Sequence, residues 1–79
     1  MNPQISTNGT KVWYNDKGEF HRLDGPAIEW IKGRKDWCIN NKTIYSLGTD
    51  GSSHIGKDVD MTDIPLEMKQ SIIEHTLKL

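Results

Sequence analysis

Basic and aromatic residues gather between positions 30 and 37, where their chemistry suits the binding of a single-stranded nucleic acid. Lys32, Arg34 and Lys35 lie between Trp30 and Trp37, around a predicted turn. Cations at a hairpin tip beside aromatic rings are one way in which sheets hold RNA or DNA strands. The same residues equally fit a solvated turn above a tryptophan core, because lysine is common at sheet edges. The sequence leaves both interpretations open.

A second polar group consists of His21, Arg22 and Asp24. The fork of an arginine side chain suits a phosphate or a carboxylate, so Arg22 is a candidate ligand-binding residue. The alternative is local, because aspartate before Gly25 and Pro26 favours a turn and its carboxylate can pair with Arg22.

Four carboxylates precede and enter the last segment of the chain: Asp58, Asp60, Asp63 and Glu67. They could imitate nucleic-acid phosphates toward a basic partner protein. They could also simply complement the positive end of a helix dipole.

Catalysis, metal binding and cofactor binding have weak support. Cys38 follows Trp37 in a predicted strand, which is typical of a buried, inert thiol. His54 lies among aspartates, but neither a calcium-loop nor a zinc spacing is present. The glycines of residues 48–56 match no nucleotide-binding fingerprint. We therefore expect no enzyme, no metal and no cofactor.

Composition narrows the classes further. A net charge of −1 and a pI of about 6.3 argue against a dedicated polybasic nucleic-acid binder. The single cysteine cannot form an intramolecular disulfide, which favours a reducing, cytoplasmic compartment. The first residues lack the basic and apolar regions of a secretory signal. No apolar run approaches the roughly 18 residues of a membrane span, so we expect no membrane partner.

Short segments rich in β-branched and aromatic residues alternate with turn signals, which is typical of an antiparallel meander. After a loose lead-in over residues 1–9, with an optional edge strand at 4–6, the predicted strands are 10–14, 19–22, 27–31, 36–39 and 43–46. Trp13 and Trp37 begin similar stretches, so the pattern repeats once. Two units are too few to bury a continuous face, and something else must cover the sheet.

The remaining residues are expected to form a loop over 47–63 and a helix over 64–79. Thr62 or Asp63 is the expected N-cap, and Pro65 suits the first turn. The predicted apolar stripe that packs on the sheet consists of Leu66, Ile73 and Leu77, with Met68 and Ile72 beside them.

The string Phe20-His21-Arg22-Leu23-Asp24-Gly25-Pro26-Ala27, with Trp13-Tyr14-Asn15 before it and residues 35–40 after it, carries a resemblance. It resembles the W-x(4)-G-x-x-H-R-x-D-G-P-A repeats of small hypothetical proteins from tailed bacteriophages and some large DNA viruses, which look like MORN-type hairpin repeats. The resemblance covers roughly residues 11–45. It implies paired strands and a phage-type protein acting on a host factor in the host cytoplasm, but no activity.

Together these patterns predict one α+β domain over residues 1–79: a meander of four or five short strands with a C-terminal helix on one face. We expect a non-catalytic accessory protein that binds a host protein and inhibits it by occupancy. Binding of single-stranded RNA or DNA is the alternative, and a homo-oligomer stays open. The expected contact residues are Trp13, Tyr14, His21, Arg22, Trp30, Lys32, Arg34, Lys35 and Trp37.

Overall fold

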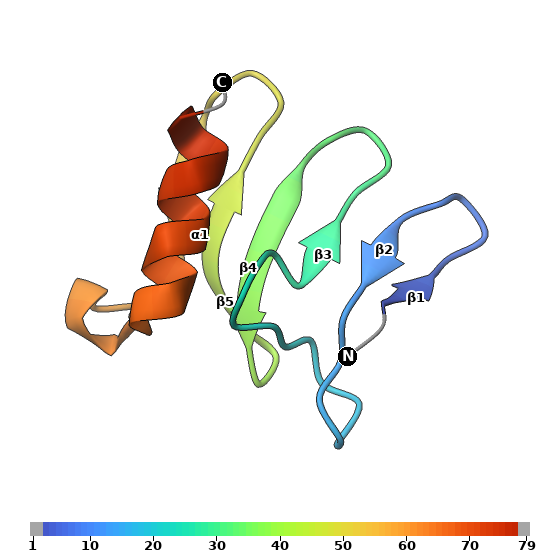
Figure 1. The fold of residues 1–79 in the computed structure, drawn as a ribbon, viewed down its shortest axis with the longest axis horizontal. Helices are drawn as coiled ribbons and strands as arrows, with labels where there is room; N and C mark the ends of the chain where they lie inside the picture. The colour runs from blue at the N-terminus through green and yellow to red at the C-terminus, as the bar shows by residue number, and fades with distance from the viewer. Residues whose placement is uncertain (1–2, 78–79) are drawn as a thin grey trace.

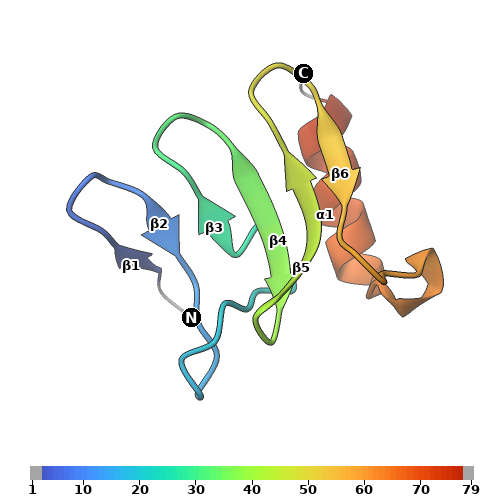
Figure 2. The same ribbon diagram turned by 180° about the vertical axis from the view of Figure 1, so that it is seen from behind.

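The computed structural model describes residues 3–77, which form one antiparallel sheet and one C-terminal helix. Six strands lie in the sheet in the order of the sequence: β1 (Gln4–Ile5), β2 (Lys11–Val12), β3 (Ile28–Glu29), β4 (Lys35–Ile39), β5 (Lys42–Leu47) and β6 (Ser53–Ile55). The 3-10 turn η1 (Met61–Asp63) leads into helix α1 (Leu66–Leu77). The helix lies on one face at the β5–β6 end (Figure 1), and Figure 2 shows the opposite face without a helix. The predicted meander with one C-terminal helix is confirmed.

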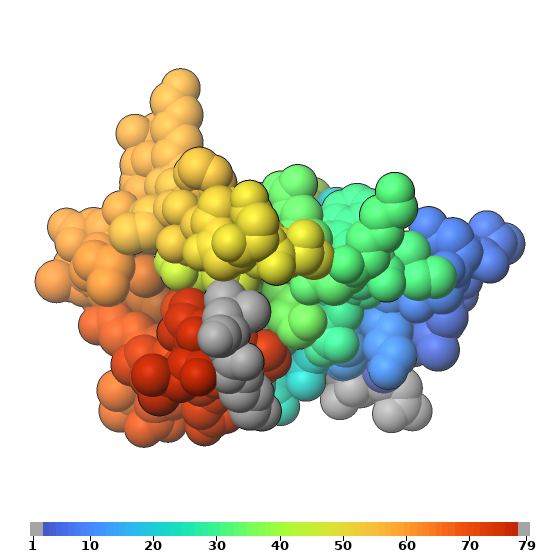
Figure 3. Space-filling model, turned by 90° about the horizontal axis from the view of Figure 1, so that it is seen from above, coloured from blue at the N-terminus to red at the C-terminus, as the bar shows by residue number. Residues whose placement is uncertain are grey.

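One turn geometry recurs along the described chain and sets the hairpin tips. In the turn over residues 15–18, the Gly18 N–H donates to the Asn15 carbonyl at 3.0 Å, and Gly18 has a φ of 78°. Glycine tolerates this left-handed conformation because it has no Cβ. The turns over 6–9, 30–33 and 48–51 have the same bond and a positive-φ glycine. The tips of these last three turns lie at one end of the sheet, toward the viewer in Figure 3, whereas the turn over residues 15–18 lies at the opposite end (Figure 1).

The predicted returning strand over residues 19–22 is wrong. Only one isolated bridge forms there, between Tyr14 and Phe20. The segment instead bonds to the end of β4, where the Arg22 N–H donates to the Cys38 carbonyl at 3.1 Å. Residues 20–22 therefore lie between the chain after β2 and the end of β4, and β3 begins only after a further loop.

The sequence analysis also missed a strand at the β5 end of the sheet. Within the predicted loop 47–63, β6 pairs with β5, with Ser46 opposite His54 and Tyr45 opposite Ile55. β6 is a short, exposed edge strand. Its sequence does not predict a strand, because only the pairing with β5 makes this segment one. The sheet therefore has six strands rather than four or five.

The main core lies between α1 and strands β4 and β5. It consists of the buried side chains of Trp37, Ile44, Leu47, Ile64 and Met68. A bulge inserts Ile44 between the residues of β5 that oppose Trp37 and Cys38. This extra residue lets β5 supply Ile44 and Leu47 to one cluster.

The predicted buried stripe of the helix is wrong for three of its five residues. Leu66, Ile73 and Leu77 are exposed, Ile73 by 55%. The packed face consists of Met68 and Ser71, with Ile72 half-buried. The helix is thus rotated from the predicted orientation, and Ser71 on its packed face accepts a hydrogen bond from the Trp37 indole N–H.

The helix start also differs from the prediction. Asp60, rather than Thr62 or Asp63, acts as an N-cap, and its carboxylate accepts a hydrogen bond from the Thr62 N–H at 3.0 Å. This cap belongs to η1. Helix α1 begins after Pro65, whose carbonyl accepts from the Lys69 N–H. The predicted helix residues 78–79, and residues 1–2 of the lead-in, lie outside the described residues.

Candidate binding surfaces

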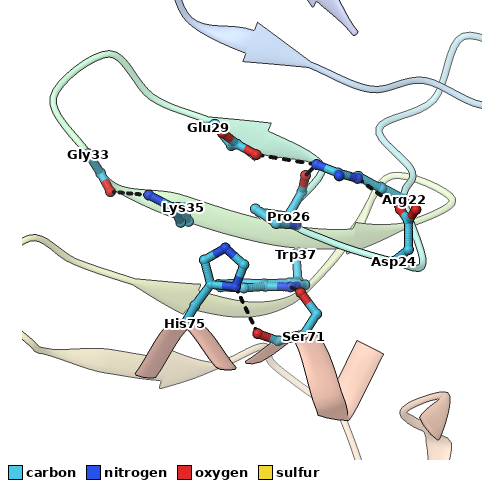
Figure 4. A network of polar contacts seen from close by, with 9 residues as sticks. All are labelled: Arg22, Asp24, Pro26, Glu29, Gly33, Lys35, Trp37, Ser71 and His75. Carbon is cyan, nitrogen blue, oxygen red and sulfur yellow. Dashed lines mark hydrogen bonds and ion pairs between the residues drawn. The ribbon is translucent and has the colours of Figure 1, made fainter. Parts of the chain in front are cut away.

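Arg22, whose side chain is half-buried, is the centre of a polar network (Figure 4). Its Nε donates to the Asp24 carboxylate at 2.9 Å, and Nη1 donates to the Pro26 carbonyl at 3.2 Å and to Glu29 at 3.3 Å. Its guanidinium carbon lies 3.9 Å from the centre of the Trp13 ring. The local ion pair between Arg22 and Asp24 is therefore confirmed.

The other residues of the repeat motif serve the same local structure. The His21 Nδ1 accepts a hydrogen bond from the Asn40 N–H at 3.1 Å. A Cβ at Gly25 would lie 2.6 Å from the Arg22 guanidinium carbon, so only glycine leaves room for the arginine. Trp13 is buried, and Tyr14 is half-buried and stacks on Phe20. These four predicted contact residues thus have partners within the fold, although Trp13, His21 and Arg22 also line an open hollow of about 280 Å³.

Trp37 was predicted to contact a partner, and this prediction is wrong because its side chain is 0% exposed. Its indole Nε1 donates to the Ser71 hydroxyl at 3.1 Å. The His75 ring meets it edge-on, with 5.3 Å between ring centres. Figure 4 shows Ser71 and His75 of the helix against the indole. This tryptophan holds α1 to β4.

Three predicted residues, Trp30, Lys32 and Arg34, do meet at an exposed hairpin tip. With Asn8 and Ile31 they line a hollow of about 280 Å³. The Trp30 indole N–H donates at 2.7 Å to Oδ2 of the buried Asp36, which fixes the ring while 42% of the residue stays exposed. Lys35 is half-buried, and its ammonium is directed to the Gly33 carbonyl (Figure 4). The predicted basic-aromatic surface is therefore smaller than expected.

An apolar groove that the sequence did not indicate lies between α1 and the β5–β6 hairpin. It has a volume of about 150 Å³ and is lined by Tyr45, Ile55, Met61, Ile64, Lys69, Ile72 and Ile73. All but Lys69 are apolar or aromatic, and Ile55, Met61 and Ile73 are about half-exposed. Isolated exposed apolar residues are normal, but a group that lines one hollow marks an interaction surface.

Carboxylates dominate the same region of the chain. Residues 57–77 contain five acidic residues and two lysines, and the acidic residues are Asp58, Asp60, Asp63, Glu67 and Glu74. All five are exposed. Asp60 and Asp63 flank Met61 in sequence, and Glu74 follows Ile73. The apolar groove thus has negatively charged neighbours, and four of the five belong to the predicted acidic run.

The reactive and metal-binding candidates give no assembled site within residues 3–77. Cys38 is buried, as predicted, and desolvation raises the pKa of its thiol above the usual value. No group of three or more histidine, cysteine or acidic side chains in the described part of the chain is placed to hold a metal. The described helix is too short to cross a bilayer.

Comparison of the chain with protein-family models, with curated proteins and with solved structures found no match. Function is therefore inferred from the hollows and exposed residues described above.

Proposed function

We propose that this chain is a non-catalytic binding protein that engages the surface of a partner protein and modulates or inhibits it by occupancy. The observation that carries the proposal is the apolar groove between α1 and the β5–β6 hairpin. Ile55, Met61 and Ile73 expose apolar surface there, and a partner side chain would remove this surface from water.

The charge around the groove favours a basic partner. Asp60, Asp63 and Glu74 lie next in sequence to groove residues or close to them, and all are exposed. Charges at the rim of an interface steer association and select partners more than they add affinity. The partner surface that fits is an apolar side chain surrounded by lysine or arginine.

The partner's source rests on the resemblance to small phage proteins, which makes a host-cell protein the target that we propose. Blocking a host protein by binding requires only a rigid surface of suitable shape and charge.

The test is affinity capture from bacterial lysate with the tagged wild-type chain and two matched variants. Ile73→Ser changes the groove, whereas Ile31→Ser changes an equally exposed isoleucine at the β3–β4 tip. We expect one protein to be captured by wild type and Ile31→Ser, with or without nuclease, and lost with Ile73→Ser. Direct titration with that purified protein should then give similar affinities for wild type and Ile31→Ser and a weaker affinity for Ile73→Ser. Equal capture by both variants would refute the groove as the binding surface.

Binding of a single-stranded nucleic acid at the β3–β4 tip is the second candidate. It is favoured by one observation, the half-exposed Trp30 beside Lys32 and Arg34. Capture that disappears with nuclease and with Trp30→Ala would select it. Its affinity should also fall steeply with salt, because phosphate contacts release counterions.

A further inference from the structure

A polar hollow on the face opposite α1 has the donors of an anion-binding site. It has a volume of about 170 Å³ and is lined by Arg34, Ser46, Gly48, Ser52 and His54. Figure 2 shows this face of β4, β5 and β6 without a covering helix. The hollow is separate from the apolar groove, which lies on the helix side.

The register of the sheet explains why these residues meet. Ser46 pairs with Asp36 on one side and with His54 on the other, so the three form a row across β4, β5 and β6. A second row lies two residues further along each strand. It consists of Arg34 just before β4, Gly48 just after β5 and Ser52 just before β6. Because Gly48 has no side chain, the Ser52 hydroxyl and the Asp50 carboxylate can lie over it in the middle of this second row.

Arg34 is held in position through its Nε alone. Its Nε lies 3.4 Å from Oδ1 of the buried Asp36, an oxygen that accepts no hydrogen bond within residues 3–77. This ion pair orients the guanidinium. In the described part of the chain, no hydrogen bond engages the two terminal amino groups of Arg34, which suit a doubly charged oxyanion.

Two carboxylates oppose anion binding: Asp36, which pairs with Arg34, and Asp50 in the turn before β6. Asp50 lies near His54, and its pKa is lowered chiefly by hydrogen bonds from the hydroxyl and N–H of Ser52. The Ser52 hydroxyl therefore donates to Asp50 rather than into the hollow. The donors that remain are Arg34, Ser46 and His54, one from the start of β4 and one from each of β5 and β6.

We propose that this hollow binds a tetrahedral oxyanion, namely the phosphate group of a phosphate monoester. Arg34, Ser46 and His54 line the hollow from three neighbouring segments, and a phosphate offers three acceptor oxygens to such donors. Arg34 also lines the hollow beside Trp30, so the organic part of the monoester can lie against that indole. The proposal is independent of the apolar groove and of its partner.

The test is a titration of the ¹⁵N-labelled chain with inorganic phosphate, phosphoserine and adenosine monophosphate, with chloride at matched ionic strength as the control. We expect saturable amide shifts confined to residues 46–54 and to the Arg34 side chain. Adenosine monophosphate should also shift the Trp30 indole signal. Shifts that grow linearly, spread over the surface or appear equally with chloride would overturn the proposal.

Three variants separate the site from general charge. Arg34→Ala should weaken phosphate binding by about tenfold, as expected for the loss of a charge-assisted hydrogen bond. Gly48→Ala keeps every charge, but its Cβ would lie 2.8 Å from the Ser52 hydroxyl and 3.1 Å from the Asp50 carboxylate, so it should displace both side chains into the hollow and abolish saturation. Asp50→Asn removes one of the two opposing charges and should tighten binding by about two- to threefold. Wild-type affinity in folded Gly48→Ala, or weaker binding by Asp50→Asn, would refute the site.

Discussion

The rotation of α1 is tested by a matched pair of substitutions on the helix, Met68→Ala and Ile73→Ala. Met68 is 0% exposed and packs with Trp37 and Leu47, whereas Ile73 is half-exposed. Truncating a buried methionine to alanine costs about 2–5 kcal/mol, because the contacts are lost and a cavity remains. At about 3 kcal/mol, the melting temperature of a domain of this size should fall by roughly 12–24 °C. For Ile73→Ala we expect a change within about 0.5 kcal/mol, because surface substitutions are near neutral and alanine favours a helix.

Thermal and urea unfolding, followed by far-UV circular dichroism and tryptophan fluorescence, measure both variants under one condition. Urea also shows whether the dependence of the free energy of unfolding on denaturant is unchanged, which a simple stability comparison requires. The apolar stripe predicted from the sequence contains both Ile73 and Met68 and therefore predicts a loss of stability for both substitutions. A larger loss for Ile73→Ala than for Met68→Ala would therefore refute the helix orientation described above.

Three further substitutions test other parts of the fold. Gly56→Ala should strongly destabilise the chain or displace β6, because the new Cβ would lie 1.9 Å from the Thr43 carbonyl oxygen; a melt and the β6 amide signals would detect this. Ser71→Ala should cost about 1–3 kcal/mol in urea unfolding, because it leaves the buried Trp37 N–H without its acceptor. The third concerns acid stability. The hydrogen bond and charge of the paired guanidinium lower the pKa of Asp24 below 3.8. A lowered folded-state pKa stabilises the fold above pH 3.8 and ceases to do so as the pH falls through the folded value. Asp24→Asn should remove this small part of the acid dependence in melts between about pH 5 and pH 2; an unchanged acid profile would show that the pair contributes nothing.

The fold was predictable where the signals are local. The turn at Asn15–Gly18 depends on a glycine with positive φ, and the two-residue turn between β4 and β5 depends on Asn40 and Asn41 with φ of 48° and 71°. Such residues specify a turn regardless of the rest of the chain. β6 and the face of α1 depend instead on tertiary pairing. A polar segment becomes a strand only beside β5, and the helix turns a serine inward to reach Trp37.

The candidate surfaces were predictable in part for the same reason. Trp30, Lys32 and Arg34 lie at a hairpin tip that local turn signals placed correctly. The apolar groove draws its residues from β5, β6, η1 and α1, and no spacing along the chain links them. The prediction of Trp37 as a surface residue was wrong because aromatic residues are used both as exposed stacking surfaces and in the core, and residue type alone does not distinguish the two.

The two tryptophans that begin the repeated stretches explain why the second stretch lacks the H-R-x-D-G-P-A string. By the sheet register, Trp13 and Trp37 lie on the same face, the one that carries α1. In the first unit the string itself covers the tryptophan, since Arg22 lies over the Trp13 ring and is held by Asp24 and Pro26.

In the second unit no such loop exists, and α1 covers Trp37 through Met68, Ser71 and His75. The helix thus takes the place of the missing string, and each tryptophan has one cover. This division leaves the outer surface of α1 unused by the sheet. Ile73 lies at the edge of that surface, where it borders the apolar groove, and the partner that we propose would add a further layer there.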